Sequence, residues 1–369
     1  MPDLRVLQVL EALEGGTARH LVDLVRTAEG VEHHVAIPSE RVGGLTDRAA
    51  AGHMIAAGAV VHVIEMRRSP PRNAAALSSL LALVHRIRPA LVHGHSSVGG
   101  ALGRIAGATA RCPRIYTPHG LAQGRAAQAA ERALGPLTDR MIAISDSEAD
   151  LVLARRLVPA GRLVTIPNGI EVEGWAPPPA TPDLRALLGI GPDTPLLGTI
   201  ARLVPQKAPE RFTRLAAAVL TARPGTHAVL IGDGPLRNAV APARLPAAVV
   251  DRFHHLPTLA EAGATLGQLD VFVLTSRFEG CPYSALEAMR AGTPVVLTDV
   301  VGNREVVADG RGGYLVPEDD GMAMAAVVLE LLADDSGRQA LGATARDHVR
   351  RFDVGAMGRA VAALYAEIT

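Results

Sequence analysis

The chain of 369 residues contains one lysine, Lys207, within the stretch ARLVPQKAPERF, and every other strongly basic side chain is an arginine. Arg202 lies five residues before it, and both follow an apolar run that predicts a strand. A guanidinium can bind two phosphate oxygens at once, and an ammonium adds a compact positive charge beside it. The pair therefore suits a diphosphate bound without a metal. Two solvated surface cations are the alternative, but the position at a strand end and the isolation of the lysine favour binding.

Two glutamates, Glu279 and Glu287, lie eight residues apart in the stretch FEGCPYSALEAMRAGTPVV, after another apolar run. Between them Gly280, Cys281 and Pro282 form a turn before a predicted helix, whose first N–H groups are free to bind a ligand. A carboxylate at the end of the loop can accept hydrogen bonds from sugar hydroxyls. One in the first turns of the helix can hold a vicinal diol such as a ribose. Stabilisation of the helix dipole is the alternative.

Gly15 and Gly16 follow the first predicted strand, in the stretch EGGTARH. They allow the backbone to approach a ligand closely, and a helix predicted to begin near Thr17 directs free N–H groups and its positive dipole end the same way. That arrangement suits a phosphate. The stretch is not a G-x-G-x-x-G fingerprint, so it gives no support to dinucleotide binding. A tight turn between strand and helix is the alternative.

The histidines do not predict a metal site. His93 and His95 alternate along a predicted strand and so share one face, but two imidazoles alone do not make a zinc site. The D-x-E spacing in SDSE, with Asp146 and Glu148, fits a helix cap near Ser145 better than a metal site. No metal and no cofactor are therefore expected. Among His20, His93, His95, His119, His254 and His255, structural or cleft-lining roles are expected for all except His119.

These side chains must be positioned by strands and helices, which alternate along nearly the whole sequence. Runs such as RVLQVLEAL and VVHVIEM predict strands, and Ala/Leu-rich stretches between them predict helices, a pattern typical of parallel sheets covered on both faces. The proline-rich segment 175–183 interrupts the alternation and predicts a join between domains. We expect an α/β chain of two doubly wound domains, 1–172 and 173–369, with ligands in the cleft between them.

Composition excludes several classes. A formal net charge of zero argues against nucleic acid as a partner, and 48% hydrophobic residues argue against disorder. The two cysteines, Cys112 and Cys281, lie too far apart in sequence to suggest a disulfide framework, which fits a reducing compartment. The start of the chain lacks the pattern of a signal peptide, and no apolar run is long enough for a membrane span. A cytoplasmic location is expected.

The motifs together resemble the retaining GT-B glycosyltransferases of family 4. The spacing E-x7-E followed by EAMRAGTPVV, with IARLVPQK and IGDGPLR upstream, carries the resemblance in the second half, and GGTARH, TPHG, IAISDSE and PNGIE carry it in the first. It covers nearly the whole chain. It implies a GT-B fold, in which two Rossmann-like domains face a central cleft. Residues 1–172 would bind the acceptor, 173–369 the donor, and the final helix, about 354–369, would pack back on the first domain.

The resemblance also implies a role for each matching residue. Gly16 lets the donor diphosphate approach, and Arg202 and Lys207 neutralise it. Glu279 holds hydroxyls of the donor sugar, and Glu287 binds the ribose. The backbone between them contacts sugar and phosphate, and the histidine of TPHG lies near the anomeric centre. The predicted site residues are Gly15, Gly16, His119, Arg202, Lys207, Glu279, Gly280, Cys281, Pro282, Tyr283 and Glu287.

The implied reaction moves a hexosyl or N-acetylhexosaminyl group, with retention at C1, to an acceptor hydroxyl on a glycan, a glycolipid or an aminocyclitol natural product. UDP-glucose or UDP-N-acetylglucosamine is the expected donor. The leaving phosphate would take the acceptor proton, so neither a protein base nor a metal is needed. A nucleotide-sugar epimerase or hydrolase on the same fold and a catalytically silent nucleotide-sugar-binding module stay open. A nicotinamide oxidoreductase would leave Arg202 and Lys207 unexplained.

Two stretches leave the acceptor open. Many members of the family have a glycine pair where this chain has Val301 and Gly302, and the loop after TPHG is short and lacks the usual aromatic residue. The stretch MRRSPPR (66–72) brings three arginines together. A solvated loop is the favoured interpretation, but contact with a membrane surface or an acidic, lipid-linked acceptor is the alternative. The oligomeric state is not predicted.

Overall fold

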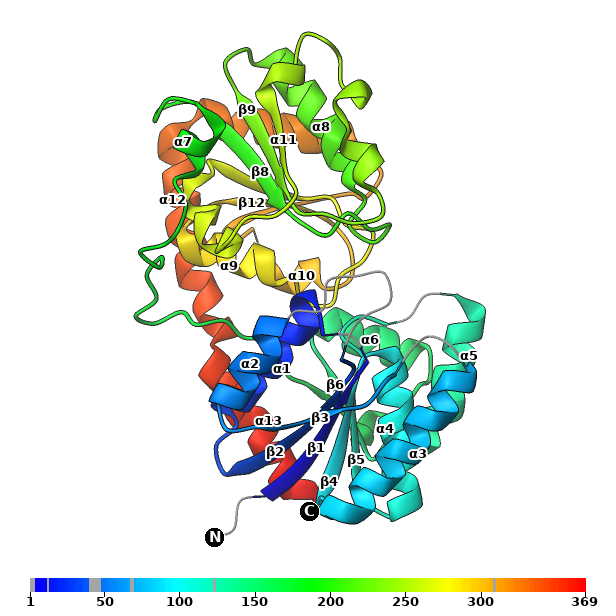
Figure 1. The fold of residues 1–369 in the computed structure, drawn as a ribbon. Coiled ribbons are helices and arrows are strands. Elements are labelled where there is room, and N and C mark those ends of the chain that lie inside the picture. Colours follow the sequence, from blue (N-terminus) through cyan, green and yellow to red (C-terminus); the bar gives the residue numbers. More distant parts are fainter. Residues whose placement is uncertain (1–3, 12, 40–47, 67–69, 122–123, 308–309) are drawn as a thin grey trace. The chain divides into compact units, whose positions relative to one another are not determined.

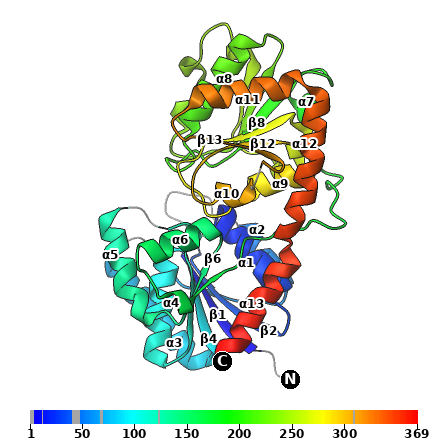
Figure 2. The same ribbon diagram turned by 180° about the vertical axis from the view of Figure 1, so that it is seen from behind.

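The structure, a computed structural model, describes residues 4–11, 13–39, 48–66, 70–121, 124–307 and 310–369 (Figure 1). The chain forms two compact units. Unit 1 is Met1–Gly169 together with Phe352–Thr369, and unit 2 is Ile170–Arg351. The join therefore lies three residues before the boundary expected at 172/173, and the chain leaves unit 2 again at 351. Each unit is a parallel sheet with helices on both faces, which confirms the predicted fold class (Figures 1 and 2).

Unit 1 is built on a sheet whose described strands are all parallel, in the order β3-β2-β1-β4-β5-β6-β7. The strands are β1 (Leu4–Leu10), β2 (Val31–Ile37), β3 (Val60–Val63), β4 (Leu91–His95), β5 (Arg114–Thr117), β6 (Arg140–Ala143) and β7 (Leu163–Thr165). The helices are α1 (Gly15–Thr27), α2 (Arg48–Ala56), α3 (Pro70–Ile87), α4 (Ser97–Ala110), α5 (Arg125–Leu134), α6 (Asp146–Ala154) and α13 (Val354–Ile368), with short 3-10 turns at η1 (Gly135–Leu137) and η2 (Ala160–Arg162).

The core of unit 1 follows the two-residue period of its central strand. Leu7 and Val9 pack under α3 and α4, whereas Val6 packs on the opposite face with α1 and α13, and Leu10 with α1 and α2. The last helix, α13, lies against α1 in both views (Figures 1 and 2). Its Gly358 sits so close to Thr27 that a Cβ would overlap that residue.

Unit 2 repeats the arrangement with the strand order β10-β9-β8-β11-β12-β13, again parallel throughout the described residues. The strands are β8 (Leu196–Ile200), β9 (His227–Ile231), β10 (Phe253–Leu256), β11 (Val271–Leu274), β12 (Val295–Thr298) and β13 (Gly313–Val316). The helices are α7 (Leu184–Leu188), α8 (Pro209–Ala222), α9 (Tyr283–Ala291), α10 (Asn303–Val306), α11 (Gly321–Ala333) and α12 (Asp335–His348). Short 3-10 turns are η3 (Arg237–Val240), η4 (Pro242–Arg244), η5 (Val250–Arg252), η6 (Ala262–Gln268) and η7 (Val349–Phe352).

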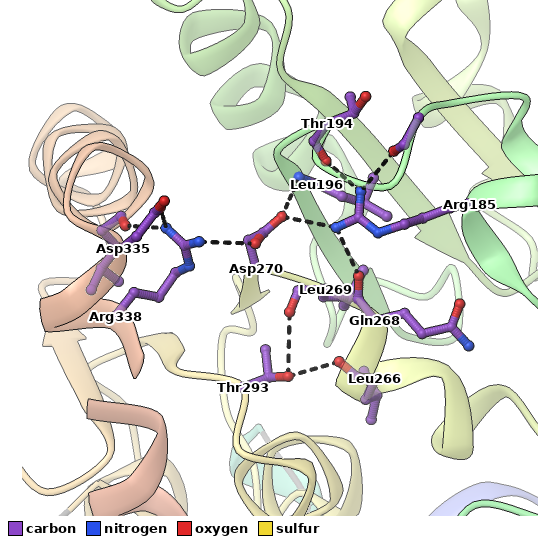
Figure 3. Close-up of polar contacts among 12 residues, drawn as sticks. Arg185, Thr194, Leu196, Leu266, Gln268, Leu269, Asp270, Thr293, Asp335 and Arg338 are labelled. Carbon is purple, nitrogen blue, oxygen red and sulfur yellow. Dashed lines mark hydrogen bonds and ion pairs between the residues drawn. The ribbon is translucent and has the colours of Figure 1, made fainter. Parts of the chain in front are cut away.

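Asp270 fastens the amino-terminal end of the second sheet (Figure 3). Its Oδ2 accepts hydrogen bonds from the Leu196 backbone N–H at 2.8 Å and from Arg185 Nη2 at 3.2 Å. Its Oδ1 lies 3.2 Å from Arg338 Nη2 on α12. One carboxylate thus joins β8, β11, α7 and α12 at the end of the sheet opposite the carboxyl ends of the strands.

Each sheet has one point where the order of strands reverses. In unit 1 the chain runs from β1 outward through β2 and β3 and returns to place β4 on the other side of β1. In unit 2 it runs from β8 through β9 and β10 and returns to place β11 beside β8. Crevices at the carboxyl ends of such strand pairs are where open α/β sheets bind ligands. The loops after β1, β4, β8 and β11 are therefore where ligands are expected to bind.

Candidate functional site

An ion pair joins the two loops at the reversal point of unit 2. Lys207, which follows β8, places its Nζ 2.6 Å from Oε1 of Glu279, which follows β11. The Glu279 side chain is only 5% exposed, and that of Lys207 is 14% exposed. Ser276 donates its hydroxyl to the same carboxylate oxygen. The pair is thus largely shielded from water. Its two charges attract each other more strongly there than they would on an open surface.

Hydrogen bonds to backbone carbonyls hold these two loops together. Gln206 donates from Nε2 to the Phe278 carbonyl at 3.0 Å, and the Arg277 N–H donates to the Gln206 carbonyl at 2.8 Å. The Thr275 hydroxyl lies within hydrogen-bonding distance of the Lys207 and Ala208 carbonyls. The lysine and the glutamate are therefore positioned by the backbone as well as by each other.

The loop that carries Arg202 depends on two glycines of the IGDGPLR stretch. Gly232 and Gly234 have φ angles of 142° and 157°. A Cβ on Gly232 would overlap the Ala201 carbonyl, and one on Gly234 would lie 2.6 Å from the Leu203 carbonyl oxygen. The Leu203 N–H in turn donates to the Asp233 carbonyl at 2.9 Å. Only glycine allows this close approach. Arg202, between Ala201 and Leu203, is exposed at the strand end.

The Glu279 loop also packs on the stretch that departs from the family pattern. The Glu279 N–H donates to the Val301 carbonyl at 3.0 Å. Gly302, with φ 86°, lies so close that a Cβ would overlap the Gly280 carbonyl oxygen. This contact requires a glycine at 302, and the chain has one. The valine at 301 takes part through its backbone, so its side chain does not disturb the hydrogen bond.

Helix α9 begins directly after this loop. Tyr283 is its first residue, and Pro282 at the N-cap has no side-chain acceptor for the N–H groups of the first turn. Cys281 and Pro282 are buried, and Tyr283 is half-buried. Glu287 lies one turn further along the helix, beside η6, where a Cβ on Gly263 would lie 2.8 Å from its Oε2. All predicted residues of the second half therefore belong to unit 2, in the loops after β8 and β11 and in α9.

In unit 1, Gly15 and Gly16 are exposed at the start of α1, which begins at Gly15 rather than near Thr17. Gly15 has φ 56°, in the left-handed region that favours glycine. The helix therefore starts two residues earlier than the sequence indicated. Both glycines lie within its first turn, where the N–H groups have no helical acceptor.

Three histidines from separate elements meet at the reversal point of unit 1. His20 lies on α1, His95 ends β4, and His119 follows β5. His95 Nδ1 and His119 Nε2 are 3.0 Å apart, and the rings of His20 and His119 meet edge to face with centroids 4.5 Å apart. His20 and His95 are buried, and His119 is partly exposed. Sequence reasoning singled out His119 and did not find the cluster.

Hydrogen bonds to amide oxygens fix the proton positions in this cluster. His95 Nε2 donates to Gln8 Oε1 at 2.9 Å, so its Nδ1 must accept from the Nε2–H of His119. His20 Nδ1 donates to Asn168 Oδ1 at 3.0 Å, which leaves a lone pair on Nε2. Burial lowers the pKa of His20 to about 4. Burial, together with the neighbouring imidazoles, lowers the pKa values of His95 and His119 well below their usual range. All three rings are therefore neutral near pH 7.

The network continues into the core and reaches the last helix. Gln8 donates from Nε2 to the Tyr365 hydroxyl at 3.1 Å. Tyr365 donates to His93 Nδ1 at 2.7 Å, and His93 Nε2 donates to the Thr117 hydroxyl at 2.8 Å. His93 is buried, and burial holds its pKa well below the usual range. It is thus a satisfied core residue, as expected for the histidines other than His119.

The backbone of His119 is held by a buried glutamate. His119 has φ 57°, and Glu148 accepts from the next N–H, that of Gly120, at 2.8 Å. The other oxygen of Glu148 accepts from the Ile144 N–H at 2.8 Å. Ser145 caps α6, its hydroxyl accepting from the Glu148 N–H at 3.1 Å. The helix cap predicted in SDSE is confirmed, and Glu148 additionally positions the TPHG loop.

The sequence matches two family models, largely one in each unit. Residues 14–173 match the model described as Glycosyltransferase Family 4, and residues 194–334 match that described as Glycosyl transferases group 1. A D-inositol 3-phosphate glycosyltransferase of Thermobispora bispora is 30% identical over 301 residues, which cover 75% of this chain and 70% of that protein. The chain belongs to glycosyltransferase family 4.

This family 4 glycosyltransferase is similar to two further curated proteins. A D-inositol 3-phosphate glycosyltransferase of Kineococcus radiotolerans is 29% identical over 307 residues, 74% of this chain and 71% of that protein. The UDP-Gal:alpha-D-GlcNAc-diphosphoundecaprenol alpha-1,3-galactosyltransferase of Escherichia coli is 28% identical over 263 residues, 66% of each protein. The matched region thus spans about two thirds of the length of that E. coli relative. Family membership makes the chain a transferase that acts on nucleotide sugars.

Solved structures show the same fold. Anabaena Alr3699/HepE in complex with UDP-glucose has a TM-score of 0.81 at 20% identity, covering 98% of this chain and 99% of that one. A glycosyltransferase of Rickettsia africae has a TM-score of 0.82 at 15% identity, covering 100% and 99%. Both likenesses confirm the GT-B fold of the family 4 glycosyltransferase.

The remaining candidates of the glycosyltransferase have structural roles or lie outside the described residues. His254 stacks on His227, with 2.9 Å between Nε2 and Nδ1, and His255 donates to the Gly232 carbonyl at 2.9 Å. Arg67 and Arg68 of the arginine-rich stretch fall outside the described residues. Within the described part of the chain, none of the helices has the length and apolar character that crossing a membrane requires.

Proposed function

We propose that the chain transfers a hexosyl or N-acetylhexosaminyl group from a nucleotide diphosphate sugar to an acceptor hydroxyl, with retention at C1. The observation that carries the proposal is the shielded ion pair between Lys207 and Glu279, with Arg202 in the same loop as Lys207, at the strand-order reversal of unit 2. UDP-glucose and UDP-N-acetylglucosamine are the proposed donors. The UDP-glucose complex of the Anabaena neighbour supports a uridine donor.

Unit 2 would bind the donor. As the bond from C1 to the β-phosphate breaks, negative charge collects on the leaving diphosphate. Lys207 and the N–H groups at the start of α9 are fixed before the reaction begins, so they would stabilise this charge without reorganisation, and Arg202 would add its charge from the same loop as Lys207. Glu279 orients the Lys207 ammonium and would accept hydrogen bonds from the donor sugar. Glu287 would hold the ribose diol.

Unit 1 would supply the N–H groups at Gly15 and Gly16 for the diphosphate and His119 for the anomeric centre. Because Nε2 of His119 donates to His95, the neutral ring keeps a lone pair on Nδ1. A neutral imidazole can accept a hydrogen bond from a sugar hydroxyl. It also adds no positive charge beside a sugar ring that itself becomes positive as the bond breaks. The lowered pKa of His119 supports this role.

The acceptor hydroxyl would attack from the face that the diphosphate leaves, and the leaving phosphate oxygen would take its proton. Two cations and a helix N-terminus supply the countercharge, so we propose that transfer needs no metal. The names of the curated relatives support an inositol phosphate or a lipid-linked glycan as the acceptor class. A hydroxyl on a cyclitol or a glycan is therefore the proposed acceptor.

The test is a panel of UDP-, GDP- and ADP-sugars, each incubated with inositol 1-phosphate, inositol 3-phosphate and a GlcNAc-diphosphate lipid, with and without EDTA. We expect acceptor-dependent release of UDP that EDTA leaves unchanged, and an axial C1 linkage by NMR. Lys207→Ala should lower kcat by about 10²-fold or more. The control is Arg277→Ala, which removes a half-exposed cation paired with Glu210 in the first turn of α8.

Other outcomes would replace the proposal. Sugar release without any acceptor would indicate a hydrolase, and interconversion of two UDP-sugars would indicate an epimerase. Binding of UDP-sugars with no turnover would indicate a silent binding module. An equal loss in Lys207→Ala and Arg277→Ala would remove the special role of the lysine.

A further inference from the structure

We propose that His20, His95 and His119 form a binding site for one divalent transition-metal ion, Zn²⁺ above all, and that the bound ion inhibits sugar transfer. One ring nitrogen from each of the three lies within 4.8 Å of those of the other two. The binding step stands on this geometry alone. The inhibition step rests on the proposed function, because it assigns His119 to the reaction.

The outer contacts of the cluster are those of a metal site. An imidazole that binds a metal usually donates its other N–H to an oxygen, which fixes the tautomer and turns the lone pair toward the ion. His20 donates to Asn168 Oδ1 and His95 to Gln8 Oε1, at 3.0 and 2.9 Å. Both amide oxygens can only accept, so a lone pair is left on Nε2 of His20 and on Nδ1 of His95.

One of these lone pairs is left unused. His20 is 2% exposed, and its Nε2 has no hydrogen-bond partner among the described residues. A buried polar atom without a partner costs free energy, and native proteins rarely keep one without a reason. A metal ion that accepts this lone pair would remove the cost. The buried nitrogen is thus an observation independent of the clustering itself.

The hydrogen bonds of the cluster leave its ligating lone pairs nearly in place. Metal ligands must be unprotonated, and Nε2 of His20 and Nδ1 of His95 already are. The one proton that must move is that on His119 Nε2, which would shift to Nδ1 as the ring takes its other tautomer. Two nitrogens bound to one tetrahedral Zn²⁺ lie about 3.3 Å apart. The present separation of 3.0 Å between His95 and His119 is close to that value.

The ion would take His119 out of the reaction. With Nε2 bound to the metal and Nδ1 protonated, His119 could no longer accept a hydrogen bond from a sugar hydroxyl, and a positive charge would stand beside the reacting carbon. Because His119 is partly exposed, the fourth position would be open to water. All three protein ligands are imidazole nitrogens, which bind Zn²⁺ well and Mg²⁺ poorly, and they therefore set the metal preference.

The chain offers matched controls for the cluster. His34 and His62 stack with 2.9 Å between ring nitrogens, and His227 and His254 do the same. Glu32 Oε1 lies 2.9 Å from His34 Nε2, but in the described part of the chain no third ligating atom converges with either pair within 4.8 Å, as the atoms of the cluster do. His62→Gln and His254→Gln therefore remove a histidine from a pair of equal geometry without touching the cluster.

The experiment is a Zn²⁺ titration of the metal-stripped full chain by competition with a chromophoric chelator, with Co²⁺ absorption as a second readout. We expect one equivalent per chain and the visible bands of tetrahedral Co²⁺. His20→Gln should weaken binding at least tenfold and remove those bands, while both control variants keep them. Asn168→Leu should weaken binding about 10- to 100-fold because it frees the His20 tautomer. Thermal melting checks that each variant folds.

Equal binding in His20→Gln and the controls, or no stoichiometric binding, would overturn the site. In the transferase assay, Zn²⁺ should inhibit the native chain reversibly with EDTA and leave the residual activity of His20→Gln unchanged. Binding without inhibition would overturn the second step only. If the chain shows no transfer at all, the proposed function fails, whereas the titration still decides the metal site.

Discussion

Tyr365 on the last helix donates a hydrogen bond to Nδ1 of His93 on β4 at 2.7 Å, across 272 residues of sequence. The same hydroxyl accepts a hydrogen bond from Gln8 on β1, the strand next to β4. Tyr365 is fully buried, and burial raises its pKa well above the usual range. Hydrogen bonds therefore join α13 to β1 and to β4, the strand that carries His95, and α13 belongs to the core of unit 1.

Tyr365→Phe should lower the free energy of unfolding by about 1–3 kcal/mol, because it leaves Gln8 Nε2 and His93 Nδ1 buried with one partner fewer. Urea unfolding followed by circular dichroism measures the change. Tyr314→Phe is the control, since Tyr314 is 43% exposed and should lose little. Equal stability of the two variants would show that the hydroxyl is not needed in the core.

Glu279→Gln should lower kcat by about 10²-fold or more while the melting temperature falls only slightly. The amide keeps the shape of the side chain and can accept from Ser276, but it no longer carries the charge that orients Lys207. Steady-state kinetics with the best donor of the panel measures the loss. Glu210→Gln, which removes the charge of the partly exposed partner of Arg277, is the control and should keep its activity.

Asp270→Ala should destabilise unit 2 by about 2–4 kcal/mol and leave KM unchanged. It removes the acceptor shared by Arg185, Arg338 and the Leu196 N–H, groups that are mostly buried (Figure 3). Chemical denaturation gives the loss. Asp335→Ala removes a partner of Arg338 that is 79% exposed and should cost far less. A change in KM in Asp270→Ala would link this end of the sheet to the site.

The free energy of unfolding should decrease as the pH is lowered because of His33. This residue is buried, and burial lowers its pKa to about 4. The unfolded chain binds a proton there near pH 6.5, whereas the folded chain does not until about pH 4. The free energy of unfolding therefore decreases as pH drops through this window, by on the order of 3 kcal/mol from this residue. Denaturation midpoints at pH 7, 5.5 and 4 should show a shallower decline in His33→Gln. Parallel curves would contradict the assignment.

The sequence contained enough to predict the fold and the loops of unit 2. The apolar run before Lys207 and the spacing from Glu279 to Glu287 are local patterns of the sequence. The structure places Lys207 in the loop after β8, Glu279 in the loop after β11 and Glu287 in the following helix. The ion pair with Lys207 adds what the pattern did not contain. It depends on β8 and β11 lying side by side, which strand order alone decides.

The histidine cluster could not be predicted because its members share no local pattern. His20, His95 and His119 lie on a helix, a strand end and a loop, and they meet only when β1, β4 and β5 are neighbours in register. Gln8 fixes the tautomer of His95 from a buried strand position that reads as part of an apolar run. A signal did exist for two of them: His95 ends β4 and His119 follows β5 by two residues, whereas His20 lies inside the helix that follows β1.

The single lysine gives this protein a built-in reporter. A protease that cuts only after lysine has one peptide bond to cleave, that between Lys207 and Ala208. Ala208 is buried with φ 48°, so cleavage requires the loop to open first. The rate of the single cut therefore measures the free energy of local opening, and its slowing by each nucleotide reports occupancy without a label.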